Sequence, residues 1–270
     1  KYTLVRGLMN VSKCFDSFFY DKKVVVTGHT GFKGSWLTSW LLRLGAKVYG
    51  FSESYLKSPS HFELLNIEDQ IHHKLGDIRD LSLISEYINQ IKPDIVFHLA
   101  AQAIVSSSYS DPLKTITTNV TGTANILEAS RKLDNKCAIV LITSDKCYEN
   151  KEWIWGYREN DQLGGKDIYS ASKGSAELII RAYLESFFHE ENVSVSIARA
   201  GNVIGGGDWA KDRIIPDIFR SWSANEPVYI RSPNSTRPWQ HVLEPLSGYL
   251  TLAEHLWNDR NFHSQAFNFG

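Results

Sequence analysis

The sequence places a tyrosine and a lysine four residues apart, in the run YSASK from Tyr169 to Lys173. At that spacing the two side chains share one face of a helix. A tyrosine with a pKa near ~10 is a poor base at neutral pH, but a neighbouring ammonium favours its phenolate form. The pair therefore predicts a device that removes a hydroxyl proton while a hydride leaves the same carbon. Because Tyr-x-x-x-Lys is common, an exposed helical pair is the alternative for this motif taken alone.

A hydroxyl, an acid and an amine stand together at Ser144, Asp145 and Lys146, directly after an expected strand from Cys137 to Thr143. Residues just past the carboxyl end of a parallel strand face the ligand crevice of an open sheet. There, the three groups could orient a substrate hydroxyl, protonate a leaving oxygen and remove a carbon-bound proton. The alternative is a polar loop that holds a surface ion pair.

The element that must position these residues is KKVVVTGHTGFKGSW, from Lys22 to Trp36. An apolar run, three glycines and an amphipathic segment predict a strand, a tight turn and a helix. Gly28 suits the backbone angles of the turn, Gly31 lets a diphosphate approach the main chain, and Gly34 permits close packing of helix on strand. A turn without a ligand would seldom keep three glycines at these offsets, so the segment predicts dinucleotide binding.

Strands and helices alternate along the chain after this unit. The expected segments are Lys47 to Phe51, a loop and short helix within Ser52 to Ile67, Ile71 to Leu75, Leu81 to Ile91, Ile95 to Leu99, Leu113 to Arg131, Cys137 to Thr143, Tyr169 to His189 and Val193 to Arg199. This alternation predicts an α/β fold with a doubly wound parallel sheet of the Rossmann type.

The pattern changes after Gly205, where we expect a glycine-rich loop, a helix near Ile214 to Trp222, short strands near Val228 and His241, and a helix from Glu244 to Trp257. We therefore expect an N-terminal extension at 1–20, a dinucleotide-binding domain at 21–200 and a smaller α/β substrate lobe at 201–270. The run AFNFG at the end is typical of a beginning strand, so we expect the lobe to be incomplete. Met9 is expected to be the natural start.

The composition is that of an ordinary globular protein. The 270 residues are 43% hydrophobic and 22% charged, with a net charge of -1 and no block of either sign. Neither nucleic acid nor a membrane is therefore expected as a partner, and no apolar run approaches the length of a membrane helix. Three cysteines, Cys14, Cys137 and Cys147, lack metal-ligand spacing, so we expect no metal and a reducing cytoplasm.

Several motifs together resemble the extended short-chain dehydrogenases that act on nucleotide sugars: TGxxGxxG, HLAAQ at His98 to Gln102, Asn119 in TNVTGT, and the set Ser144, Tyr169 and Lys173. Longer segments are similar to those of the CDP-glucose 4,6-dehydratases, over nearly the whole chain from about Val24. They are TGHTGFKGSW, TSDKCYENKEWIWGYREN, RAGNVIGGGDW, DRIIPD and RPWQHVLEPLSGYL.

The resemblance implies NAD as cofactor, a nucleotide sugar as substrate, a cytoplasmic homodimer, and a place in deoxysugar biosynthesis such as that of lipopolysaccharide O-antigen. It implies a set of cofactor contacts: Gly28, His29, Thr30, Gly31, Phe32, Gly34, Ser52, Asp77, Ile78, Leu99, Ala100, Ala101, Gln102, Asn119, Tyr169 and Lys173. It places Asn202, Arg213 and Arg237 at the sugar diphosphate, for which an arginine fork is suited.

The resemblance also implies a mechanism. Tyr169, helped by Lys173 and Ser144, takes the proton of the sugar 4-hydroxyl, Asp145 protonates the departing 6-hydroxyl, and Lys146 manages the proton on carbon 5. A lysine near its ordinary pKa of about 10.4 is mostly protonated, and making it a base near pH 7 costs on the order of 4 kcal/mol unless burial shifts it. Lys146 is therefore either a base or a cation that stabilises the enolate.

Three departures from the family pattern bear on function. Ser52 and Glu53 follow the second strand where an acid often binds the ribose, Ser106 stands where the family commonly has an arginine, and KDI precedes Tyr169 without the usual proline. An epimerase or reductase of the same fold, or a catalytically impaired dinucleotide-binding protein, are the alternatives. Asp145 and Lys146 favour dehydration, because an epimerase has no leaving hydroxyl to protonate.

Overall fold

A computed structural model describes residues 15–54, 59–190 and 192–270. Cys14 and Met9 lie outside these ranges. The strands are β1 (Lys23–Thr27), β2 (Lys47–Ser52), β3 (His72–Leu75), β4 (Ile95–His98), β5 (Cys137–Ile142), β6 (Val193–Ala200), β7 (Asn202–Ile204), β8 (Trp239–His241) and β9 (Ala266–Phe269). The α-helices are α1 (Phe32–Arg43), α2 (His61–Leu65), α3 (Leu81–Ile91), α4 (Val105–Ser110), α5 (Pro112–Ile116), α6 (Gly122–Ser130), α7 (Ile168–Phe187), α8 (Ile214–Ser223) and α9 (Leu243–Asn258).

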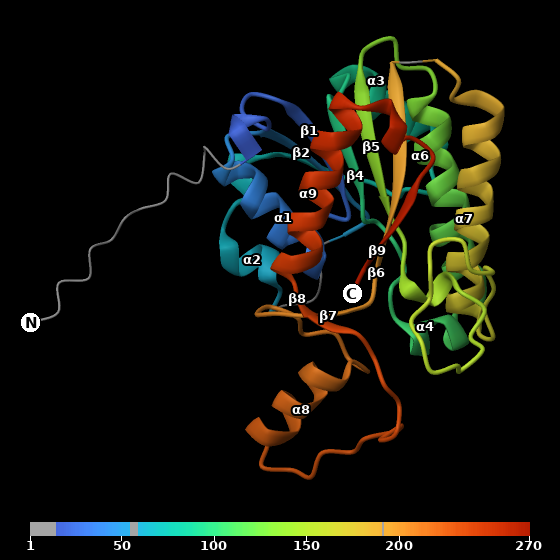
Figure 1. The fold of residues 1–270 in the computed structure, drawn as a ribbon. Coiled ribbons are helices and arrows are strands. Elements are labelled where there is room, and N and C mark those ends of the chain that lie inside the picture. Colours follow the sequence, from blue (N-terminus) through green and yellow to red (C-terminus); the bar gives the residue numbers. More distant parts are fainter. Residues whose placement is uncertain (1–14, 55–58, 191) are drawn as a thin grey trace, which may run out of the picture.

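Seven strands form one sheet in the order β3-β2-β1-β4-β5-β6-β9, and every neighbouring pair in it is parallel. The strand order reverses between β1 and β4, which opens a crevice at the carboxyl ends of these strands. The predicted doubly wound parallel sheet is therefore confirmed. Strands β7 and β8 form a separate parallel pair below that edge, next to the segment that carries α8 (Figure 1).

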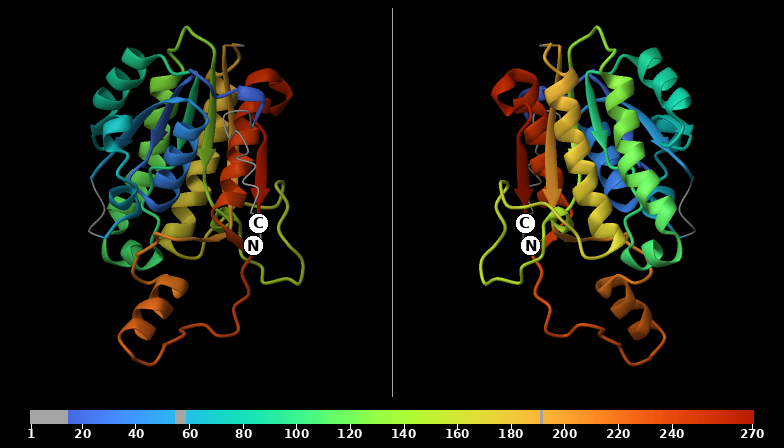
Figure 2. Two further views of the ribbon diagram at one scale, coloured as in Figure 1. Left: turned by 90° about the vertical axis from the view of Figure 1, so that its left-hand side faces the viewer. Right: turned by 90° about the vertical axis from the view of Figure 1, so that its right-hand side faces the viewer.

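Helices cover both faces of the sheet, as the two side views of Figure 2 show. Successive side chains of a strand point to opposite faces, so Val24 and Val26 pack with α1 and α9 while Val25 packs with α3, α6 and α7. The same alternation runs through β5, where Val140 belongs to the first cluster and Ile139 to the second. Strands buried on both faces explain the continuous apolar runs in the sequence.

The start of α7 is fixed by Asp167, whose carboxylate accepts hydrogen bonds of 2.9 and 2.7 Å from the amide and hydroxyl of Ser170. An aspartate at this position satisfies an amide that the first helical turn leaves without a partner. The KDI run that lacks the family's proline thus still supplies a cap. It places Tyr169 in the first turn of the helix.

Two expectations are corrected or refined. Val228 lies outside any strand, because the irregular segment around it is largely exposed and has no neighbouring strand to pair with. The helix expected from Leu113 to Arg131 comprises α5, a π-helical turn from Thr117 to Thr121 and α6. The division at residue 200 stays a prediction. However, β9 pairs with β6 in the main sheet, and α9 packs on its face.

Candidate active site

The glycine turn has the geometry that the sequence predicts. Gly28 has a φ of +73°, and a Cβ there would lie 2.8 Å from the amide nitrogen of Ala100. A Cβ on Gly34 would overlap the carbonyl oxygen of Gly28, so the close packing of α1 is confirmed. At Gly31 an added Cβ would meet that same carbonyl oxygen, at 3.1 Å, and no other atom within 4 Å. The open side of Gly31 at the N-terminus of α1 fits a dinucleotide diphosphate.

Behind this turn, His98 links the ends of β1 and β4. Its Nδ1 lies 2.8 Å from Thr27 Oγ1, and its Nε2 lies 3.1 Å from Thr123 Oγ1. Because Thr123 donates its own proton to the carbonyl of Asn119 at 2.8 Å, we assign the proton of His98 to Nε2. Burial, with the nearby charge of Lys173, lowers the pKa of His98 to about 3. His98 is therefore a neutral structural link.

Asn119 connects the loop after β4 to α7. Its Oδ1 accepts from the Gln102 amide at 2.9 Å, and its Nδ2 donates to the Gln102 carbonyl and to Ser172 Oγ at 3.1 and 2.9 Å. Asn119 stands in the π-helical turn, an irregularity often found at functional sites. The structure thus brings Leu99, Ala100, Ala101 and Gln102 beside the helix that carries Tyr169.

The far side of the turn holds His29 and Ser52. Their side chains lie 2.9 Å apart, and His29 Nε2 lies 2.6 Å from His73 Nδ1. Burial, followed by the proximity of His73, lowers the pKa of His29 to about 4, so the ring is neutral at pH 7. Thr30 donates to the carbonyl of Ser54 at 2.9 Å, which ties the turn to the end of β2. Phe32 is buried in the core that α1 covers.

The remaining predicted cofactor residues lie at the edge next to β2 and β3. Asp77 holds Arg79 through hydrogen bonds, which together with the charge of Arg79 keep the pKa of Asp77 below its usual range. Ile78 is buried against Gly122. Glu53 pairs with Lys114 at 2.9 Å. These residues share one edge of the crevice, and the Ile78 carbonyl accepts a hydrogen bond of 3.0 Å from Asn125.

Ser144, Asp145 and Lys146 form a short 3₁₀ turn at the carboxyl end of β5. Ser144 donates a hydrogen bond of 3.0 Å to Asp145 Oδ1, and its Oγ accepts from the Lys146 amide at 3.3 Å. The turn packs against α7, and Ser144 lies near enough to Tyr169 to lower the pKa of its phenol. The predicted catalytic groups from β5 and α7 therefore meet at one point.

The pKa of Tyr169 is raised to about 12, chiefly by burial, although the nearby Ser144 hydroxyl opposes the shift. The nearby charge of Asp145 raises it further, whereas Arg213 lowers it. That the Lys173 ammonium favours the phenolate of Tyr169 stays a prediction. Burial disfavours both the Tyr169 phenolate and the Lys173 ammonium, and it therefore also lowers the pKa of Lys173 to about 8.

Lys33 belongs to this site and was not among the predicted residues. It is partly buried, and burial together with the charges of Lys173 and Arg213 lowers its pKa to about 7, while Asp145 opposes the shift. Its Nζ lies 3.5 Å from Tyr249 Oη. Clustered pKa shifts of this kind are typical of active sites. In the sequence, the position of Lys33 inside the GFKG run of the glycine turn could have indicated that it lies at the site.

The structure brings two of the three predicted substrate residues toward the crevice. Arg213 caps the start of α8, pairs with Asp208 at 2.8 Å and acts electrostatically on Tyr169. Asn202 begins β7, directly after β6. Arg237 is exposed, and its guanidinium donates to the carbonyl of Thr236 at 2.6 Å. Ser106 lies on α4 and donates to Asp212 at 2.7 Å.

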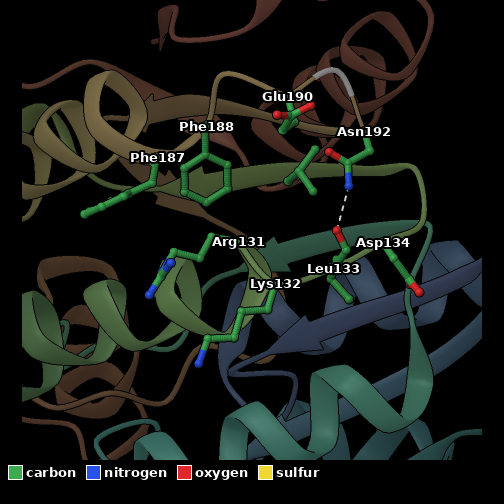
Figure 3. Close-up of a pocket in the computed structure, with 9 residues that line it drawn as sticks. Arg131, Lys132, Leu133, Asp134, Phe187, Phe188, Glu190 and Asn192 are labelled. Carbon is green, nitrogen blue, oxygen red and sulfur yellow. Dashed lines mark hydrogen bonds between the residues drawn. The ribbon is translucent and has the colours of Figure 1, made fainter.

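A separate hollow lies at the other end of the sheet (Figure 3). It is lined by the ends of α6 and α7 and the start of β6, including Arg131, Phe187 and Asn192. The Asn192 amide donates to the Leu133 carbonyl at 2.6 Å. Because this hollow lies at the amino ends of the strands, it is not the crevice that holds the candidate catalytic groups.

Within the described ranges, His, Cys, Asp and Glu side chains do not gather in threes that could hold a metal ion. Among the helices of those same ranges, none is long and apolar enough to cross a membrane.

The comparisons with known proteins agree with this geometry. A family model described as GDP-mannose 4,6 dehydratase matches residues 25–263. A CDP-glucose 4,6-dehydratase of Salmonella typhimurium is 52% identical over 259 residues, which cover 94% of this chain and 72% of that protein. A solved epimerase from Methanothermobacter thermautotrophicus is 25% identical with a TM-score of 0.81, covering 98% of this chain and 76% of its own. The solved complex of MoeE5 with UDP-glucose and NAD is 25% identical with a TM-score of 0.74, covering 92% of this chain and 76% of its own.

Proposed function

The chain belongs to the GDP-mannose 4,6 dehydratase family, and we propose that it is an NAD-dependent hydro-lyase that converts CDP-glucose to CDP-4-keto-6-deoxyglucose. The observation that carries this proposal is the meeting of Tyr169 with Ser144, beside Asp145 and Lys146, at the crevice next to the glycine turn. The identity of 52% to a CDP-glucose enzyme favours the cytidine nucleotide over other bases.

The open backbone at Gly31, the N-terminus of α1 and the loop from Leu99 to Gln102 would hold NAD. When bound, NAD supplies the acceptor for the hydride of sugar carbon 4 and the donor of the hydride that carbon 6 receives. Because the same hydride returns, substrate and product differ by one water and no net oxidation. The residues of the chain have to manage the protons of this sequence.

As its phenolate, which the Lys173 ammonium and the Ser144 hydroxyl would stabilise, Tyr169 would take the proton of the 4-hydroxyl. The Ser144 hydroxyl has one proton, which it gives either to Asp145, as in this structure, or to the Tyr169 phenolate. Turning that hydroxyl toward Tyr169 would stabilise the phenolate as it forms. It would also release Asp145 to act on the departing 6-hydroxyl.

In its protonated form, Asp145 would donate the proton that leaves with the 6-hydroxyl as water, and the proton taken from the 4-hydroxyl would restore the acid for the next turnover. Lys146, the next residue in the same turn, would either accept the proton of carbon 5 or stabilise the enolate as a cation. Both roles require Lys146 beside carbon 5, which the position of the turn at the carboxyl end of β5 supports.

An epimerase or reductase of the same fold is the second candidate, supported by the structural similarity to a solved epimerase. Asp145 and Lys146 argue for dehydration instead. Incubation with NAD and, separately, CDP-glucose, dTDP-glucose or GDP-mannose tests the proposal. We expect a product lighter by one water from CDP-glucose. Epimerised or reduced sugar without water loss would support the second candidate. Bound NAD without turnover of any of the three would indicate a non-catalytic protein.

The resemblance also supports a cytoplasmic homodimer in deoxysugar biosynthesis, such as that of lipopolysaccharide O-antigen. Large apolar side chains stand exposed on α5 and α7, with Leu113 72% and Leu178 57% exposed. Pairing of these helices across two copies would cover them. Analytical ultracentrifugation of the chain and of a Leu113→Glu/Leu178→Glu variant tests this: a dimer that becomes monomeric supports the pairing, whereas a monomeric parent protein contradicts it.

A further inference from the structure

A buried ion pair lies directly behind the candidate catalytic residues. Glu177 and Arg199 are both fully inaccessible, and Arg199 Nε donates to the two Glu177 carboxylate oxygens at 2.8 and 3.0 Å. Arg199 Nη2 also donates to this carboxylate, and Thr143 donates a further hydrogen bond to it at 2.7 Å. Taking two charges out of water is costly, and a pair that is fully hydrogen-bonded offsets that cost.

The pair is connected to both halves of the catalytic set. Glu177 follows Lys173 by four residues on α7 and therefore stands one turn further along the same face. Thr143 immediately precedes Ser144. A single carboxylate thus lies one helical turn from the lysine of α7 and holds the strand end from which Ser144, Asp145 and Lys146 extend.

Arg199 extends the network to the loop after Lys146. Its Nη1 donates to Tyr148 Oη at 2.6 Å and to the Glu159 carbonyl at 2.9 Å. Tyr148 in turn donates to Asn268 Oδ1 at 2.6 Å, and Asn268 Nδ2 donates to the Tyr157 carbonyl at 3.0 Å. Both ends of the segment from Tyr148 to Glu159 are therefore tied to β6 and β9.

The charges around Lys173 single out Glu177. The titratable groups that act on or respond to Lys173 are Glu177 on α7, Cys147 on the turn after β5, Lys33 on α1 and His98 on β4. Burial keeps His98 and the Cys147 thiol neutral at pH 7, and Lys33 loses its charge above pH 7. Glu177 is thus the charged group that opposes the effect of burial on the pKa of Lys173.

We propose that Glu177 and Arg199 are positioning residues of the dehydratase site. Glu177 keeps the buried Lys173 ammonium charged, and Arg199 locks the segment from Tyr148 to Glu159 beside the catalytic turn. The inference rests on the proposed function for its kinetic readout. An ion pair with a purely structural role would affect folding but would leave the titration of the site unmoved.

The double variant Glu177→Gln/Arg199→Met tests the first half, because replacing the whole pair leaves no unpaired buried charge. We expect the alkaline limb of the kcat profile with CDP-glucose to move toward acid by roughly one pH unit. Thr143→Val is the matched control. It removes a hydrogen bond from the Glu177 carboxylate but keeps the charge of Glu177, so the alkaline limb of its kcat profile should stay at the same pH. A double variant with an unmoved limb overturns this half.

A second measurement needs no change at the ion pair and no cofactor. The Tm of the parent protein minus that of Lys173→Met is followed against pH. A Lys173 pKa of about 8 in the folded state, below its ordinary 10.5, makes this difference rise between those two values. A rise that begins well below pH 7 would mean that Glu177 does not keep the Lys173 ammonium charged. That result overturns the proposed role of Glu177 even if the double variant fails to fold. If CDP-glucose is not a substrate, this series still tests the ion pair.

Tyr148→Phe tests the second half, since it removes the hydroxyl that accepts from Arg199 and leaves both buried charges paired. We expect kcat to fall several-fold with an unmoved alkaline limb and unchanged Tm within a few degrees. Tyr157→Phe, which removes a hydroxyl from the same segment without touching Arg199, is its control. An unchanged kcat in Tyr148→Phe overturns the positioning role of Arg199.

Discussion

The hydroxyl of Ser106 donates a hydrogen bond of 2.7 Å to Asp212, across 106 residues of sequence. The contact joins α4, after β4, to the residue that precedes Arg213 at the start of α8. The serine that departs from the family's arginine therefore has a definite partner here. It links the sheet to the segment that carries a predicted substrate residue.

Removing this link should affect substrate binding more than chemistry. For Ser106→Ala we expect KM for CDP-glucose to rise about 2- to 10-fold with kcat nearly unchanged, since a typical hydrogen bond contributes about 0.5 to 1.5 kcal/mol net and this one is exposed to solvent. Steady-state kinetics measure both constants. Ser110→Ala, which removes a hydroxyl bonded within the same short helix, should leave KM unchanged. An equal rise in both variants would contradict a specific role for Ser106.

Tyr169→Phe should abolish most of the chemistry while leaving cofactor binding intact. General acid–base catalysis by one side chain contributes about 10²- to 10⁴-fold, and we expect a loss of kcat in that range. Single-turnover assays measure the rate, and titration with NAD measures Kd. A variant that keeps kcat within a factor of about three would assign the proton transfer to another group.

Substitutions at Lys146 separate its two proposed roles. Lys146→Gln should leave oxidation at carbon 4 observable, as absorbance of the reduced cofactor, while water loss stops. Lys146→Arg keeps a cation that cannot act as a base. Residual dehydration by the arginine variant supports enolate stabilisation, whereas none supports the base. Full dehydration by the glutamine variant would exclude both roles.

Lys33→Met should change the pH dependence of stability. The folded pKa of Lys33 is lowered to about 7 from 10.5 by burial and by neighbouring cations, so the unfolded chain binds more protons between those values. The unfolding free energy of the parent protein should therefore rise with pH in that window by up to ~1.4 kcal/mol per pH unit relative to the variant. Denaturant titrations at several pH values measure the difference. If the unfolding free energies of the parent protein and the variant change with pH in parallel, Lys33 titrates at its ordinary pKa.

The sequence was sufficient to predict the parallel sheet, whereas the roles of the predicted site residues stay predictions. Alternating apolar segments determined the parallel sheet, and strand ends placed Ser144 next to Tyr169. The burial that raises the pKa of Tyr169 was not predicted, because it depends on packing that motif spacing does not reveal. Val228 was predicted in a strand from its local preference, but a strand requires a partner. Arg199 and Glu177 come from distant segments, so their pairing was not predicted.

The pairing of β9 with β6 has a consequence for the order of assembly. Six strands of the sheet precede residue 201, whereas β9 begins at Ala266 and must cross the intervening lobe to reach β6. Long-range parallel pairing is slow because the connecting chain must be closed first. We expect β9 to dock last, bringing Asn268 to Tyr148 and Tyr157 and closing the loop beside the catalytic turn. Pulsed hydrogen exchange during refolding should then show protection of β1 and β4 well before that of Phe267 and Asn268.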